Sequence, residues 1–229
     1  MLIAHRGDNI RHQENTIAAF EGAHSLGACA IQTEIQYSAD DTPWCHSGAV
    51  WRPVGREARP FHRMRDRELR NAGLTSFAEL VDWAGRHRHL DWFVELQPAL
   101  LERLTRKDAV GPLVRRLLPF SDSFIVLAQD IHSLRLARNL GCHQVALKLD
   151  SAAKCLSVDV VTLAPDYLQI RDDQVDCQEL PPGPWQWVVY EINSATDAVR
   201  WRDRGAHHLL TGNLPLLMRS REASDVYGF

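Results

Sequence analysis

The chain has 229 residues, of which 45% are hydrophobic, so it can build one sizeable core, and we expect a single domain over residues 1–229. Its 26 Lys and Arg residues against 29 Asp and Glu residues leave a formal charge of −3. That balance excludes a global attraction to nucleic acid or to an anionic membrane surface, so no nucleic-acid partner is expected.

The five cysteines are scattered, and their odd number argues against a disulfide framework and against zinc-ligand spacing. No apolar stretch reaches the roughly 18 residues that a membrane span needs. The first apolar run begins at the second residue, which leaves no room for a secretion signal. We therefore expect a cytoplasmic protein without stable membrane insertion, and a longer native leader stays an open alternative.

Short apolar runs alternate with helical patterns along the chain, which is the strand-then-helix unit that builds a parallel sheet. Eight runs are predicted as strands: residues 2–4, 30–36, 92–96, 124–128, 144–149, 158–163 or slightly later, 187–192 and 208–211. Eight such units predict an α/β protein with the TIM (β/α)8 barrel fold.

The segments between these runs carry helix signals. Ile17, Phe20 and Ala23 recur at helical spacing, and Ser76 is a predicted N-cap of a helix that runs to about Gly85. Three glycines stand where a left-handed cap would end a helix before the next strand: Gly27, Gly141 and Gly205.

Residues 48–72 are poorly patterned and contain seven arginines between positions 52 and 70. This stretch is interpreted either as a solvated loop leading into a helix or as a lid that recruits phosphate. The first reading is preferred.

Polar residues suited to phosphate chemistry stand where predicted strands end. His5-Arg6-Gly7 follows the first strand and combines a proton-transfer group with a fork of donors that suits phosphate oxygens. In a barrel the carboxyl ends of the strands form one rim, so Glu34 and Glu95 are expected to converge there with His5.

Gln32 and Glu34 lie two residues apart in one predicted strand and therefore point to the same side. An inward carboxylate is costly unless it is paired or binds a cation, so Glu34 is predicted either as a metal ligand or as a core residue paired with Arg6. Together with Glu95, these oxygen donors suit Mg²⁺ or Ca²⁺ far better than a soft metal.

The order of these elements resembles the glycerophosphodiester phosphodiesterases, whose pattern runs H-R-G, E-N-T, E-x-D, H-D, E-x-K and T-D-x-P. The matching segments here are His5-Arg6-Gly7, Glu14-Asn15-Thr16, Gln32-Thr33-Glu34, His46-Ser47, Glu95-Leu96-Gln97 and Thr211 to Pro215. The resemblance spans Ile3 to Pro215. It implies a metal-dependent hydrolase that cleaves glycerophosphodiesters into an alcohol and glycerol 3-phosphate, with the ion at the positions of Gln32, Glu34 and Glu95.

Several positions depart from the family pattern. Gln32 is neutral where the family has a carboxylate, and Glu34 is one methylene longer than the usual Asp. The protein charge facing a divalent ion therefore falls from minus three to minus two, which should weaken binding and favour Ca²⁺. Three further replacements lie in the other motifs: Ser47 and Asn213 for Asp, and Gln97 for Lys.

The resemblance gives His5 and His46 the general acid and base roles without fixing which does which. The segment from Gln32 to His46 is one residue shorter than the common spacing, which would reverse the facing of His46 unless a bulge corrects it. Arg6 is expected to clamp a phosphate oxygen.

The remaining predicted substrate contacts are less direct. Glu14 and Asn15 match the element beside the site, and helix capping by Asn15 is an alternative that is compatible with this role. Lys148 is proposed to supply the charge of the missing family lysine, and Tyr190 to wall the glycerol pocket. Glu191 is interpreted as an extra ligand or as an exposed charge.

These observations leave three candidate functions. The first would act on a small-molecule phosphodiester as its substrate. The preferred one is the hydrolase. The second is a catalytically impaired barrel that binds a phosphorylated small molecule without turnover, and the third is an enzyme for another phosphodiester, such as a phospholipid headgroup bond. The sequence does not indicate the oligomeric state or the headgroup preference.

Overall fold

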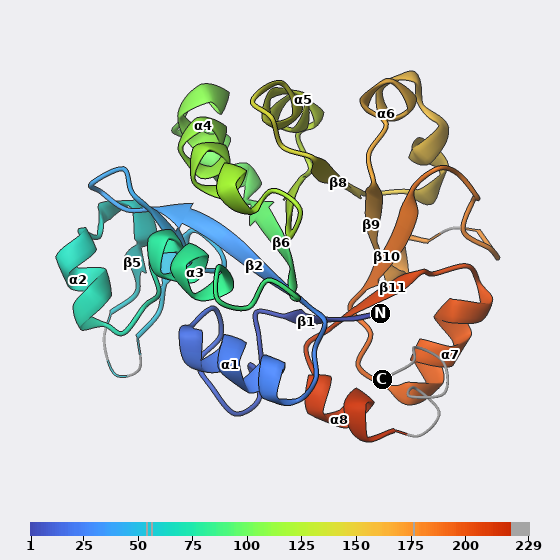
Figure 1. The fold of residues 1–229 in the computed structure, drawn as a ribbon, viewed down its shortest axis with the longest axis horizontal. Coiled ribbons are helices and arrows are strands. Elements are labelled where there is room, and N and C mark those ends of the chain that lie inside the picture. Colours follow the sequence, from blue (N-terminus) through green and yellow to red (C-terminus); the bar gives the residue numbers. More distant parts are fainter. Residues whose placement is uncertain (54, 56, 176, 221–229) are drawn as a thin grey trace.

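The computed structural model describes residues 1–53, 55, 57–175 and 177–220, and within them eight parallel strands form a closed barrel surrounded by helices (Figure 1). The barrel strands are β1 (Leu2–His5), β2 (Ala30–Tyr37), β6 (Asp91–Leu96), β7 (Phe124–Ala128), β8 (Gln144–Leu149), β9 (Tyr167–Arg171), β10 (Gln186–Tyr190) and β11 (His208–Thr211). The predicted TIM (β/α)8 fold is confirmed.

The barrel closes because β1 pairs on both sides. Ile3 is in register with Ala30 of β2 and with Leu210 of β11. A short strand, β3 (Pro43–Cys45), adds antiparallel to the end of β2, with Ile35 opposite Cys45. A two-stranded ribbon of β4 (Val50–Trp51) and β5 (Arg59–Pro60) follows in the segment that the sequence patterns poorly.

The helices on the outside of the barrel are α1 (Ile17–Ser25), α2 (Asp66–Asn71), α3 (Phe77–Ala84), α4 (Arg106–Leu117), α5 (Ile131–Asn139), α6 (Val158–Leu163), α7 (Ala195–Asp203) and α8 (Leu214–Arg219) (Figure 1). Ser76 caps α3 by accepting the N–H of Glu79, as predicted. The three predicted glycine stops all have positive φ angles: Gly27, Gly141 and Gly205. None of the described helices is long and apolar enough to cross a membrane.

The core has two parts because strand residues alternate faces. Outward residues such as Trp92 and Phe124 pack with the helices around the barrel. Inward residues such as Ile3, Phe93 and Val188 form a separate buried cluster inside it. All five cysteines are free thiols in this structure.

The sixth predicted strand has to be corrected, because residues 158–163 form α6 and the strand lies later, at β9. Ser157 caps the helix by accepting the N–H of Val160, and Asp159 occupies its first turn. Only Val160 and Leu163 face the core, whereas Val158 is 81% exposed. Because this exposed helix is rich in apolar, β-branched residues, its sequence pattern resembled that of a buried strand.

Gly7 fixes the approach of the first loop to α1. Its φ is +82°, and a Cβ there would lie 2.6 Å from the backbone carbonyl carbon of Ala19. We expect Gly7→Ala to lower the free energy of unfolding by roughly 2–4 kcal/mol, because backbone strain and a backbone clash add. Gly73, with φ +73° and nothing within 4 Å of its added Cβ, is the matched control.

Urea denaturation of both variants checks this prediction. Gly73→Ala should lose only the conformational part, about 1 kcal/mol. Equal losses in the two variants would show that the contact with Ala19 is unimportant.

Candidate functional site

A layer of polar side chains caps the apolar interior at the carboxyl ends of the strands. Because strand residues alternate, His5, Glu95 and Tyr190 lie two positions beyond the interior residues Ile3, Phe93 and Val188. They line one pocket of about 680 Å³, together with Arg6, Gln32, Glu34 and Lys148. Seven of the ten predicted site residues therefore lie in this pocket, at the end of the barrel where the strands predict it.

The loop after β1 holds Arg6 in an unusual backbone conformation. Arg6 and Asn15 have φ angles of +64° and +58°, a region that residues other than glycine seldom occupy. The N–H of Arg6 donates to the carbonyl of Gln32 at 2.7 Å, and the N–H of Asn15 donates to the carbonyl of Arg6 at 3.0 Å. These bonds stabilise a strained turn that aims the Arg6 side chain at the pocket.

Glu34 is buried at 1% exposure and is paired on both oxygens. Its Oε1 lies 2.7 Å from Nε of Arg6 and 3.2 Å from Nε2 of His5. Its Oε2 accepts a hydrogen bond of 2.9 Å from the Asn15 amide. Burial alone would raise the pKa of Glu34, but these partners outweigh burial and lower it to about 2.

Glu95, directly beside Glu34 in the sheet register, is also paired on both oxygens. Its Oε1 accepts from Nζ of Lys148 at 2.8 Å, and its Oε2 accepts from the Gln32 amide at 2.9 Å. The Gln32 oxygen in turn accepts from the Gln169 amide at 2.7 Å. The structure therefore brings the predicted metal ligands together, but through hydrogen bonds to protein donors.

Two carboxylates flank His5. Nε2 faces Glu34, and Nδ1 lies 3.4 Å from Oε1 of Glu191, which follows β10. Burial opposes the charged imidazole, but the hydrogen bonds to Glu191 and Glu34 outweigh it and raise the pKa of His5 to about 9. These two carboxylates therefore favour the imidazolium form of His5 at neutral pH.

This pKa predicts a pH dependence of stability. A group whose pKa rises from 6.5 to about 9 on folding stabilises the protein fully below pH 6.5 and loses that contribution as the pH rises through 9. The free energy of unfolding should therefore fall across this window more steeply in the wild type than in His5→Gln. Urea denaturation at both ends of the window measures the difference, with the exposed His143→Gln as control.

Parallel curves for the wild type and His5→Gln would contradict the pairing of His5 with Glu34 and Glu191. The His143→Gln control should instead follow the wild type.

His46 lies in a neighbouring pocket rather than in the one that holds His5. Its backbone N–H donates to the carbonyl of Glu34 at 2.9 Å, one step beyond the Ile35–Cys45 pair. His46 is thus opposite Glu34, and its side chain lies on the same face of the sheet as that of Glu34. The segment from Gln32 to His46, although one residue shorter than in the family pattern, therefore does not turn His46 to the other face. Its ring stacks on Phe61 at 4.5 Å, and burial lowers its pKa.

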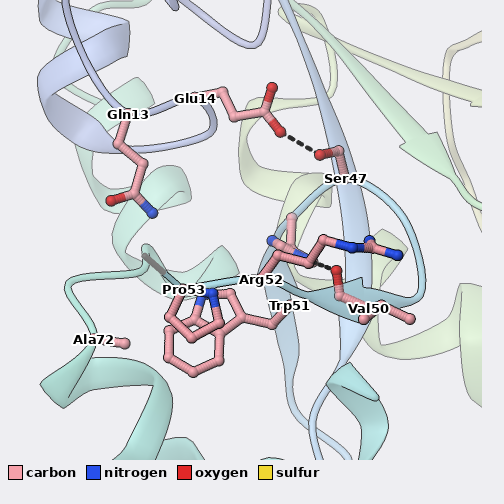
Figure 2. A pocket seen from close by; sticks show the side chains of 9 residues that line it. Gln13, Glu14, Ser47, Val50, Trp51, Arg52, Pro53 and Ala72 are labelled. Atoms are coloured by element: carbon pink, nitrogen blue, oxygen red, sulfur yellow. Dashed lines mark hydrogen bonds between the residues drawn. The ribbon is translucent and has the colours of Figure 1, made fainter. Parts of the chain in front are cut away.

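Glu14 connects the two pockets. One of its oxygens pairs with Arg6 at 2.9 Å, and the other accepts from the Ser47 hydroxyl (Figure 2). Glu14 and Ser47 line the His46 pocket, together with Trp51 and Arg52 from the arginine-rich segment (Figure 2). Ser47 is therefore linked to Arg6 through Glu14, and the arginine-rich segment lines part of the second pocket.

The other departures from the family pattern have different consequences. Asn213 caps α8 by accepting the N–H of Leu216, so its role here is structural. Gln97 lines the His5 pocket. Lys148 stacks over the Tyr190 ring at 4.7 Å, which confirms that both residues face the same space.

The donor set does not fit a divalent cation as it stands. Both oxygens of each carboxylate accept from protein donors, and the Gln32 oxygen is turned toward Gln169. Among the described residues, no group of three or more His, Cys, Asp or Glu residues is arranged to hold a metal ion. The predicted metal role of Gln32, Glu34 and Glu95 stays a prediction.

The sequence analysis did not predict the contacts of two residues at the site, Gln169 and Glu191. Gln169 is fully buried at the centre of the barrel, and only the face alternation of β9 could have indicated it. Glu191 was read as either a ligand or an exposed charge. Its contact with His5 assigns it a third role, that of a hydrogen-bond partner that keeps the imidazole charged.

Comparison with known proteins shows which family and which solved structures the chain resembles. A model of the glycerophosphoryl diester phosphodiesterase family matches residues 5–117, nearly half of the chain. The matched range contains eight of the ten predicted site residues, all except Lys148 and Tyr190. A glycerophosphodiester phosphodiesterase of Caldanaerobacter subterraneus is 50% identical over 40 residues, which is 18% of this chain and 16% of the relative.

Solved structures share the fold over nearly the full length. A phosphodiesterase of Oleispira antarctica, solved with its product sn-glycerol-3-phosphate, has a TM-score of 0.82 at 14% identity and covers 98% of this chain and 96% of its own. A glycerophosphodiester phosphodiesterase of Thermotoga maritima has a TM-score of 0.75 at 14% identity, with 93% and 94% covered. Residues 5–117 therefore match the glycerophosphoryl diester phosphodiesterase family, and the whole chain shares the fold of solved phosphodiesterases of this kind.

Proposed function

We propose that the protein is a phosphoric diester hydrolase that cleaves glycerophosphodiesters into an alcohol and glycerol 3-phosphate. The observation that carries this proposal is the arrangement of His5 and Arg6. A charged imidazole and a guanidinium line one pocket, and both are anchored by the buried Glu34. The product bound to the Oleispira antarctica relative supports the same substrate class.

The opposed pKa shifts support an assignment of the two histidines. His5, with its pKa raised, starts protonated and suits the general acid, whereas His46, with its pKa lowered, starts neutral and suits the base. As the oxygen of the attacking hydroxyl bonds to phosphorus, its proton passes to His46. The bond between phosphorus and the oxygen of the departing alcohol breaks, and that alcohol oxygen takes the proton of His5.

Arg6 is proposed to hold a non-bridging phosphate oxygen. Its Nε and one terminal nitrogen already pair with Glu34 and Glu14, so the fork is fixed in orientation before substrate arrives. Tyr190 then walls the opposite side of the pocket, near the glycerol part of the substrate.

The resemblance of the sequence motifs to the family implies a divalent cation in the pocket. Mg²⁺ or Ca²⁺ at Gln32, Glu34 and Glu95 is the corresponding prediction for this chain, and such an ion would supply charge to the phosphate. The pairing of both carboxylates with protein cations weighs against that prediction.

The assay that tests the function measures release of choline or ethanolamine from the corresponding glycerophosphodiesters, with and without chelator. Wild type should release the alcohol, and His5→Ala should not. Binding of glycerol 3-phosphate without release of any alcohol would favour the second candidate, the non-catalytic barrel. That candidate is favoured by the replacements at Gln32, Ser47 and Gln97.

A further inference from the structure

Lys148 occupies the centre of the polar layer. It lies on β8, its side chain is 15% exposed, and its Nζ donates to Oε1 of Glu95 at 2.8 Å. The ammonium also lies 4.7 Å over the Tyr190 ring. The ion pair with Glu95 and the contact with the Tyr190 ring therefore hold the lysine side chain in a fixed position within the pocket.

Gln32 can present only its amino end to Glu95. A carboxylate accepts hydrogen bonds and donates none, so the Gln32 oxygen must point away, and it accepts from Gln169. Gln32, Glu95 and Gln169 are all nearly or fully buried. Gln32 therefore contributes neither negative charge nor a free oxygen to a cation in the pocket.

The charges of the layer balance without a metal ion. Glu34 pairs with the Arg6 guanidinium at 2.7 Å, and Glu95 pairs with the Lys148 ammonium at 2.8 Å. A divalent cation between the two carboxylates would meet two protein cations and would have to displace both. A phosphate anion that contacts Arg6 and Lys148 directly meets both cations as partners.

We propose that Lys148 is the fixed cation of the phosphate subsite and takes the place of a divalent metal ion, so that the pocket binds a phosphate group without any metal. This inference rests on the proposed function, because it assumes that the ligand carries phosphate. An ammonium has three donors, of which one binds Glu95 and a second interacts with Tyr190. The third donor serves a phosphate oxygen in the pocket that Arg6 and His5 also line.

Binding measurements test the proposal without recourse to activity. By calorimetry in the presence of chelator, wild type should bind sn-glycerol 3-phosphate, and Lys148→Met should bind it at least about tenfold more weakly because a charge-assisted contact is lost. Lys148→Arg should retain most of the affinity. Lys107→Met, at an exposed lysine of α4, is the matched control and should bind like the wild type.

The double variant Gln32→Glu/Lys148→Met tests whether a divalent metal ion can in turn take the place of the Lys148 ammonium. It places three carboxylates at the centre and removes the ammonium, so it should gain binding of Mg²⁺ or Ca²⁺, seen as heat and as a metal-dependent rise in Tm. Wild type should show neither effect at millimolar metal. Uptake of either ion by wild type, or binding of sn-glycerol 3-phosphate only when metal is added, would overturn the proposal.

Failure of the inference and failure of the function give different results. Hydrolysis that is lost in chelator and restored by Mg²⁺ or Ca²⁺ rejects the lysine role and keeps the hydrolase. Metal-free binding of sn-glycerol 3-phosphate without cleavage of any diester keeps the lysine role and rejects the hydrolase. If Lys148→Met does not fold by circular dichroism, the wild-type metal titration still decides.

Discussion

His5→Gln is expected to lower kcat for glycerophosphodiester hydrolysis by about 100- to 10,000-fold, the usual contribution of a positioned proton donor. The imidazole lies between Glu34 and Glu191, which hold it protonated and orient both of its nitrogens. Gln can replace part of this hydrogen bonding but cannot transfer a proton. Affinity for sn-glycerol 3-phosphate should change far less than kcat, because Arg6 and Lys148 remain.

Steady-state kinetics and product binding, measured on the same preparation, separate these effects. His143→Gln is the control, since His143 also pairs with a carboxylate, that of Asp122, but is 62% exposed and remote from the pocket. Retention of wild-type kcat by His5→Gln would remove His5 from the proposed chemistry.

Arg6→Ala is expected to reduce both stability and kcat/KM. The guanidinium is the closest charged partner of the buried Glu34, so its loss should lower the free energy of unfolding by about 2–3 kcal/mol. This value is below the usual cost for a fully buried pair because 28% of the Arg6 side chain is exposed and His5 still faces Glu34. Loss of the phosphate fork should lower kcat/KM by at least about tenfold.

Arg135→Ala is the matched control for stability. It breaks an ion pair with Asp159, which is 71% exposed, and should cost less than about 1 kcal/mol. Urea denaturation and steady-state kinetics measure the two effects. If Arg6→Ala and Arg135→Ala were equally stable, the pairing of Arg6 with Glu34 would not contribute to the fold.

The barrel could be predicted from the sequence because its strands are short, buried on both faces and followed by clear helix signals. The predicted runs at 124–128, 144–149 and 208–211 coincide with β7, β8 and β11. The predicted strand at 158–163 was wrong because most of its β-branched residues lie on the exposed face of a helix, whose local signals are the Ser157 cap and Asp159 in the first turn. Local composition and local capping disagreed there, and capping decided the structure.

The sequence predicted which residues line the pocket but not which hydrogen bonds and ion pairs they form. Strand ends and motif order indicated His5, Arg6, Glu34 and Glu95, which the barrel then brings to one rim. The partner of each carboxylate depends on which strands are neighbours and on their register. Gln169 reaches Gln32 across 137 positions of sequence, and no local pattern carries that information.

The identity of the phosphorus product tests the central claim most directly. When wild type is incubated with glycerophosphocholine, ³¹P NMR should show the diester signal decline and a phosphomonoester signal rise in equal amount. A diester signal that keeps its full intensity, while the protein demonstrably binds sn-glycerol 3-phosphate, would contradict the account and identify a binding barrel.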